Sequence, residues 1–141
     1  MPLHTSQRGQ ASIEYMLVSS AFLAIVLLVL PAASGLSESI SFALDSFAAK
    51  SFSVSLESAV SEAMVLDNGT VISLRARPAG EWIVSASGGN FSVLPSYGKR
   101  KLSSPIIAPI PQSAYLETKS IQGEFGITVS KTAYGVSLEY S

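Results

Sequence analysis

The chain has 141 residues, of which 48% are hydrophobic and only 13% are charged, so it is too apolar for a disordered tail and too lightly charged for an ordinary soluble domain. Its formal net charge of -1 lacks the basic excess that nucleic-acid binding requires. The absence of cysteine and the single histidine, His4, exclude disulfides and thiolate metal sites and leave most general-base and transition-metal chemistry without its usual residues. We therefore expect no enzymatic activity, no cofactor, no metal site and no nucleic-acid partner.

The first long element is an uncharged apolar run over residues 15–33, YMLVSSAFLAIVLLVLPAA. At about 1.5 Å per helical residue it approaches the roughly 30 Å of bilayer hydrocarbon, which predicts a membrane-spanning helix. Arg8 precedes it, and the positive-inside rule keeps the leader in the cytoplasm. A secretory signal peptide cleaved near residues 31–35, PAASG, is the competing interpretation. Against it, Glu14 occupies the place of the positive flank, and the run exceeds the usual apolar length of about 7–15 residues.

Residues 8–15 read RGQASIEY and lead directly into the apolar run. This segment resembles the class III signal peptide of archaeal type IV pilin-like proteins. Archaeal motility-filament subunits have a related leader but are Gly-rich after the cut, whereas this chain has SIEY at residues 12–15, which favours a pilin. The resemblance implies that a prepilin peptidase cuts between Gly9 and Gln10 and that the apolar helix stays on the mature protein. It also implies a pilus assembly ATPase, a membrane platform and further copies of the chain as partners.

Glu14 is the ionisable group at the edge of the apolar run, where a carboxylate is costly unless it is paired, hydrogen-bonded or protonated. The resemblance implies that Glu14 pairs with the new α-amine of Gln10 on a neighbouring subunit. Two unit charges about 4 Å apart attract by about 4 kcal/mol at an effective dielectric near 20, before desolvation is subtracted. The alternative is that Glu14 rests at the headgroup level or supports the first helical turn.

Small residues interrupt the apolar run, and a proline lies near its end. Ser19, Ser20, Ala21 and Ala24 would let helices approach closely, although a lone lipid-facing anchor tolerates the same composition. Pro31 removes one backbone donor, so we expect it to kink or locally open the helix.

Beyond Gly35, the spacing of apolar residues predicts a continuing helix with two apolar faces. The alternation over residues 51–56, SFSVSL, also suits a strand, but the flanking segments fit the helical period better. One face would contact the chain's own C-terminal domain and the other its neighbours. The first face comprises Leu36, Ile40, Ala43, Phe47 and Val54, and the second comprises Ala48, Phe52, Leu56, Ala59 and Ala63.

The turn sequence Asp67-Asn68-Gly69 ends this helix, and the remaining residues favour antiparallel sheet. The segment 103–112 carries three prolines and is expected to be an extended connection or a frayed edge. The candidate strands are Thr70–Arg77, Glu81–Ala86, Phe91–Leu94, Tyr115–Ile121, Phe125–Ser130 and Val136–Tyr140.

Two N-glycosylation sequons begin at Asn68 and Asn90, both at predicted turns, where these residues also serve the turn directly. The basic cluster at residues 99–101, KRK, is expected to be a solvated surface, with surface attachment as the alternative. The tyrosines of this region and Trp82 are expected to pack mostly in the core or on a sheet face.

Together these patterns predict an α+β chain of type IV pilin-like layout. Residues 1–9 form a cleaved cytoplasmic leader, residues 10–66 the N-terminal helix with 15–33 in the membrane, and residues 67–141 an extracellular antiparallel β domain. The expected function is that of a structural subunit of an archaeal type IV-like adhesion pilus, a membrane precursor that becomes a cell-surface filament. The alternatives are a minor pilin or pseudopilin of a secretion or uptake machine, and a monomeric membrane-anchored binding module.

Overall fold

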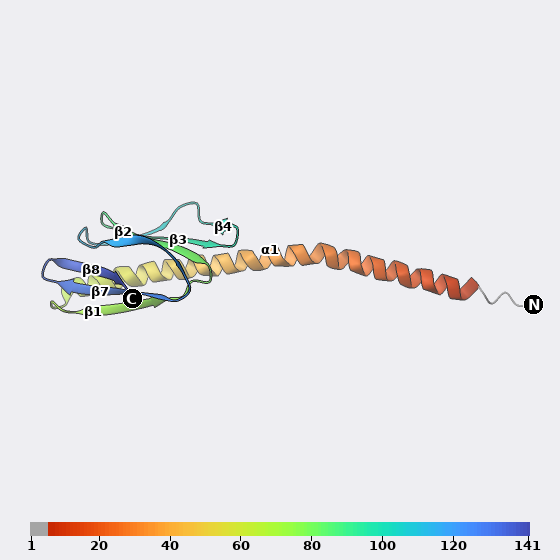
Figure 1. Ribbon diagram of the computed structural model, residues 1–141, viewed down its shortest axis with the longest axis horizontal. Helices are drawn as coiled ribbons and strands as arrows, with labels where there is room; N and C mark the ends of the chain where they lie inside the picture. Colours follow the sequence, from red (N-terminus) through yellow and green to blue (C-terminus); the bar gives the residue numbers. More distant parts are fainter. Residues whose placement is uncertain (1–5) are drawn as a thin grey trace, which may run out of the picture. The chain divides into compact units, whose positions relative to one another are not determined.

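The computed structural model describes the backbone from residue 6 and the side chains from residue 12, to the end of the chain at residue 141. One long helix, α1 (Ser6–Val65), precedes antiparallel strands (Figure 1), an α+β arrangement as expected. The chain divides into two compact units, Met1–Ser37 and Glu38–Ser141, and the boundary falls within α1. Within the first unit, the described residues 6–37 are all helical, whereas the second unit contains the rest of α1 and the described strands.

α1 ends at Val65, one residue before the predicted end at residue 66, and a hydrogen-bonded turn follows it. The Leu66 N–H still donates to the carbonyl of Glu62 at 3.1 Å. Both the N–H and the hydroxyl of Thr70 then donate to the carbonyl of Asp67, at 3.2 and 2.8 Å. This turn satisfies backbone and side-chain groups locally, and it directs the chain into the first strand.

The strands form two antiparallel sheets. The first has the order β1-β7-β8, from β1 (Val71–Ala76), β7 (Phe125–Thr132) and β8 (Gly135–Tyr140). The second has the order β4-β3-β2-β6, from β4 (Arg100–Lys101), β3 (Asn90–Tyr97), β2 (Glu81–Ser87) and β6 (Leu116–Gln122). A short strand, β5 (Ile106–Pro109), also pairs with β3. Six strands correspond to predicted ones, β5 is the edge alternative that was expected for residues 103–112, and β4 was not expected as a strand.

The proline-rich segment became strand β5 because it lies along the edge of β3. Val93 pairs with Ile106 and Asn90 pairs with Pro109, so the prolines stand at or beyond the ends of a four-residue edge strand. β3 also runs three residues beyond its predicted end at Leu94, through Pro95 to Tyr97. Its outer edge is paired with β5 up to Val93 and with β4 from Ser96, so Pro95 lies in the gap, where its carbonyl accepts the N–H of Leu102 at 3.3 Å.

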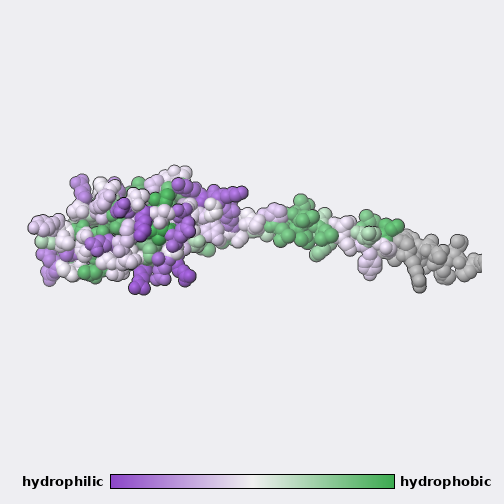
Figure 2. Space-filling model, viewed as in Figure 1, coloured by the Kyte–Doolittle hydropathy of each residue, from purple (hydrophilic) through white to green (hydrophobic). Residues whose placement is uncertain are grey.

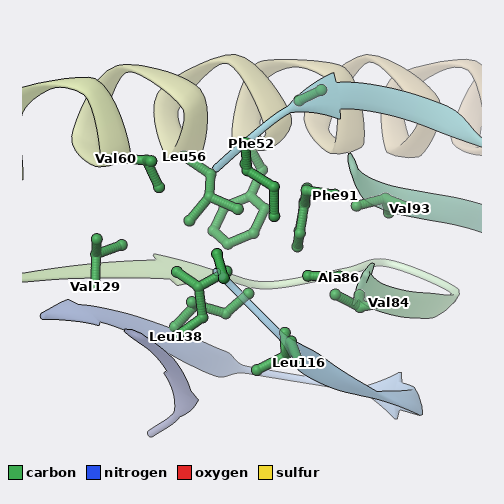
Figure 3. Packing of buried hydrophobic residues seen from close by; sticks show 14 of the residues in the cluster. Phe52, Leu56, Val60, Val84, Ala86, Phe91, Val93, Leu116, Val129 and Leu138 are labelled. Carbon is green, nitrogen blue, oxygen red and sulfur yellow. The ribbon is translucent and has the colours of Figure 1, made fainter. Parts of the chain in front are cut away.

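The core lies between the C-terminal part of α1 and the two sheets (Figure 3). Phe52 joins all three, because its ring centroid is 6.1 Å from that of Trp82 and 6.2 Å from that of Phe91 in the second sheet, and 5.4 Å from that of Phe125 in the first. Alternating buried positions along β2 and β7 complete the packing. Each edge-to-face aromatic pair adds about 0.5–1.5 kcal/mol beyond its buried area.

Candidate membrane and assembly segment

The apolar N-terminal part of α1 has no cover in the described structure. It is the helix among the described residues that is long and apolar enough to cross a membrane, and none of its most apolar stretch is buried. Leu17, Phe22 and Leu28 are 63, 65 and 76% exposed, and Figure 2 shows hydrophobic residues gathered along this stretch. An apolar surface of this extent requires a lipid or protein environment.

Two serine hydroxyls in or next to this stretch donate to the backbone of the same helix. The hydroxyl of Ser20 donates to the carbonyl of Leu17, and the hydroxyl of Ser34 donates to that of Pro31, each at 2.9 Å. These serines can therefore face hydrocarbon or another helix without leaving an unpaired donor. α1 remains helical through Pro31.

Small side chains on one side of this stretch leave a shallow hollow of about 360 Å³, lined by Ser12, Tyr15, Met16, Ser19, Ser20 and Leu23. Three of the six lining residues are serines, whose side chains are small. A recess of this kind can accept bulky side chains from a second helix.

The predicted processing and pairing residues lie at the N-terminal end of α1. Gly9 and Gln10 belong to the helix, but their surroundings lie outside the described residues. Glu14 is exposed, and no ion pair joins it to another described side chain. An exposed carboxylate at the start of an apolar surface is available to a group on another molecule.

In the second unit, α1 has one buried face and one exposed apolar face. Phe52, Leu56, Ala59 and Ala63 are buried as predicted, whereas Ala48 is exposed and Ala49 takes its place in the core. On the opposite side, Ile40, Leu44, Phe47 and Val54 are 52, 65, 72 and 58% exposed, and we call these four residues the outer stripe. The 3.6-residue period keeps the two faces separate.

Two carboxylates that sequence reasoning missed attach α1 to the β domain. Asp45 is only 2% exposed, and it accepts the backbone N–H of Ala79 at 2.8 Å and the indole N–H of Trp82 at 2.9 Å. Glu38 accepts the backbone N–H of Lys99 at 3.0 Å. The sequence did contain a signal for Asp45, because helical spacing places this carboxylate on the predicted buried face of α1. A carboxylate in that position needs hydrogen-bond donors from the rest of the fold.

A tyrosine hydroxyl connects the two sheets at the far side of the core. Tyr140 of β8 lies 2.9 Å from the carbonyl oxygen of Glu117 and 3.2 Å from that of Val84, so its proton can be donated to the second sheet. Burial, and after it the negative charge of Glu117, raises the pKa of Tyr140 to about 12. The hydroxyl therefore stays protonated at neutral pH.

The remaining predicted sites are exposed. Asn68 lies in the turn after α1 and Asn90 begins β3, and both are accessible to a glycosylating enzyme. Lys99, Arg100 and Lys101 are exposed in the turn after β3 and in β4. Trp82 is buried as expected, but Tyr115 and Tyr134 are 65 and 97% exposed and were wrongly expected to pack. No cluster of three His, Asp or Glu side chains that could hold a metal ion occurs among the described residues.

Comparison with known proteins adds no assignment. No protein-family model, no curated protein and no solved structure matches the chain.

Proposed function

We propose that the protein is a structural subunit of an archaeal type IV-like pilus, cut between Gly9 and Gln10 and polymerised through its N-terminal helix. The observation that carries the proposal is a continuous helix with two unlike parts. Its apolar N-terminal part, preceded by the segment RGQASIEY, is exposed, and its C-terminal part is fixed in a β domain by one face. A precursor would hold the exposed part in the membrane, and a filament would hold it in a bundle.

The outer stripe distinguishes a filament subunit from a simple anchor. An anchor needs apolar surface only over the bilayer, yet Leu44, Phe47 and Val54 lie well beyond residue 33 and are more than half exposed. Burying one such side chain contributes about 1.5–3 kcal/mol. The stripe therefore supports contact with neighbouring helices along the part of α1 that carries the β domain.

In this function, Glu14 sets the axial register of the subunits. After the cut, the α-amine of Gln10 is a cation in an apolar bundle, and the Glu14 carboxylate of a neighbour can neutralise it. A pair of this kind adds little net stability because both charges lose water, but an unpaired charge is strongly disfavoured. Only the register that forms the pair is then populated.

The first test is the N-terminal sequence of the mature protein recovered from the cell surface. A start at Gln10 supports the proposal, and a start beyond Gly35 would show ordinary secretion.

The second test measures filament yield by electron microscopy of a Glu14→Ala strain. We expect filaments to disappear while the membrane-held subunit persists, and Glu62→Ala, which removes an exposed carboxylate elsewhere on α1, to leave the yield unchanged. Unchanged filaments in Glu14→Ala would contradict the pairing. A wild-type strain without filaments built from this chain would favour a minor pilin or a monomeric binding module.

A third test addresses the outer stripe. Phe47→Ala should reduce filament yield without changing the unfolding of the β domain, because Phe47 is 72% exposed. Tyr134→Ala is the matched control, since it removes a 97% exposed aromatic side chain outside α1. Equal yields in the two variants would contradict the role of the stripe.

A further inference from the structure

A basic turn lies against α1 shortly after the apolar segment. It comprises Lys99, Arg100 and Lys101, all exposed, and we call these three residues the basic turn. Within the described part of the chain, the one ion pair joins Arg75 to Glu124, so the three cations have no carboxylate partner. Hydrophilic side chains are visible at the position of β4 (Figure 2).

The basic turn is held to the helix at a defined residue. The Glu38 carboxylate accepts a hydrogen bond from the backbone N–H of Lys99 at 3.0 Å. It therefore binds the backbone of the basic turn and forms no ion pair with its side chains. Gly98, at φ +58°, packs so closely that a Cβ there would lie 2.6 Å from Oε1 of Glu38. The positive φ favours glycine at this position, and a larger residue would also have to displace the Glu38 side chain.

Chain length places this contact near the end of the apolar segment. Glu38 is five residues after Ala33, the last residue of the apolar run. The connection spans about 7.5 Å as helix and at most about 18 Å if fully extended. The polar headgroup layer on each side of a bilayer is roughly 5–7 Å thick. Residues 33–38 are helical, so when the apolar run spans the membrane this contact lies at or just outside the headgroup layer.

We propose that the basic turn is a membrane-surface contact that binds anionic lipid headgroups and orients the β domain on the bilayer before assembly. This inference rests on the membrane stage of the proposed function and not on polymerisation. Each Lys or Arg held near an anionic surface is attracted to it, and three of them strengthen surface contact by roughly 100-fold. The attraction operates only within about a Debye length, so it is lost when the subunit leaves the membrane.

The test uses fluorescence quenching in lipid vesicles, and the chain suits it because it contains no cysteine. Full-length protein carries a fluorophore on Ser104→Cys, beside the basic turn, or on Ser87→Cys, an exposed residue at the opposite end of β3. Ser87 pairs with Asn90, and Ser104 lies two residues before Ile106, which pairs with Val93. The two labels are therefore three to five strand residues apart, about 10–17 Å. Vesicles contain nitroxide-headgroup lipid with either phosphatidylglycerol or phosphatidylcholine.

We expect quenching of the Ser104 label in phosphatidylglycerol vesicles and little at Ser87. The triple variant Lys99→Gln, Arg100→Gln, Lys101→Gln should lose about half or more of that quenching, as should 1 M salt, where the Debye length is about 3 Å. Equal quenching with phosphatidylcholine, or in the triple variant, would overturn the inference. Unchanged circular dichroism of the triple variant shows that its fold is intact.

A third label separates this inference from the proposed function. Leu27→Cys, in the apolar run, should be quenched by acyl-chain nitroxide lipid. If the label at position 27 is quenched and the label at position 104 is not, the proposed headgroup contact of the basic turn is wrong and the membrane stage stands. If the label at position 27 is not quenched, the membrane stage is wrong, and the inference fails with it. If the triple variant keeps its headgroup contact but forms no filaments, the cations bind another copy of the chain, and the inference is again overturned.

Discussion

Replacing Asp45 should destabilise the β domain more than any other single change to a carboxylate on α1. Its two oxygens each accept a different donor, the part-buried Ala79 N–H at 2.8 Å and the buried Trp82 indole N–H at 2.9 Å. Asp45→Ala leaves both donors without a partner. One unsatisfied buried donor costs about 1–3 kcal/mol, so we expect a loss of about 3 kcal/mol in the free energy of unfolding, with water replacing part of the lost acceptor.

The effect is measurable by thermal unfolding of the full chain in detergent. For a unit of roughly 100 residues, 1 kcal/mol corresponds to about 4–8 °C, so Tm should fall by roughly 12–24 °C. Trp82 is the single tryptophan and is 1% exposed, which makes its fluorescence a direct probe of the site. The control Glu62→Ala should change the free energy of unfolding by less than about 0.5 kcal/mol.

A double-mutant cycle separates this hydrogen bond from general packing. Asp45→Asn keeps one acceptor oxygen, so its amide NH₂ must face one of the two N–H donors. Trp82→Phe removes the indole donor, and the NH₂ of Asn can then face that position without a clash between donors. We expect the double variant to be more stable than the sum of the single losses by about 1 kcal/mol, read by circular dichroism because the tryptophan is gone. Additivity within about 0.5 kcal/mol, or an unchanged Tm in Asp45→Ala, would refute the bridging role of Asp45.

Two further predictions concern the core. Tyr140→Phe removes the hydroxyl that joins the sheets, and it should lower the free energy of unfolding by about 0.5–1.5 kcal/mol at neutral pH. The folded state keeps the Tyr140 proton up to its pKa of about 12, while an unfolded tyrosine loses it near pH 10. Stability should therefore fall from pH 10 to 12 in the wild type, and by less in the variant, in denaturant unfolding across that range; parallel pH profiles would contradict this. Phe52→Ala should cost about 3–5 kcal/mol because Phe52 is 7% exposed. Phe47→Ala, at 72% exposure, should cost less than about 0.5 kcal/mol, and similar losses of Tm in both would contradict the assignment of the two faces.

Local patterns were sufficient for the helix and six of the strands, because an uncharged apolar run and helical spacing indicate α1, and turn residues separate segments rich in β-branched residues. They failed for β4 and could not decide between a connection and an edge for β5. β4 has two residues and β5 is bounded by prolines, so neither has a period to detect. Both exist because the free edge of β3 offers backbone partners, and that edge is a property of the folded sheet.

The same limit applies to the residues that attach α1 to the β domain. The partners of Asp45 are 34 and 37 residues away in sequence, and the partner of Glu38 is 61 residues away. Charge patterning shows that a carboxylate is present but cannot name a distant backbone donor. Ala48 and Ala49 show a milder failure, since two adjacent alanines have nearly the same preference for burial and periodicity alone assigned the wrong one to the core.

On the proposed function, the two parts of α1 also differ in what drives their assembly. The part within the β domain is stabilised by its own core, so it enters a filament already folded. The apolar part exchanges lipid for other helices, and lipid tails are as apolar as leucine, so this exchange gains little from the hydrophobic effect. Close packing at small residues such as Ser19 and Ser20, together with the pairing of Glu14, must then select the filament over the membrane. Because the hydrophobic effect adds little to this exchange, we expect an ATP-driven assembly machine to supply the work that withdraws the helix from the bilayer.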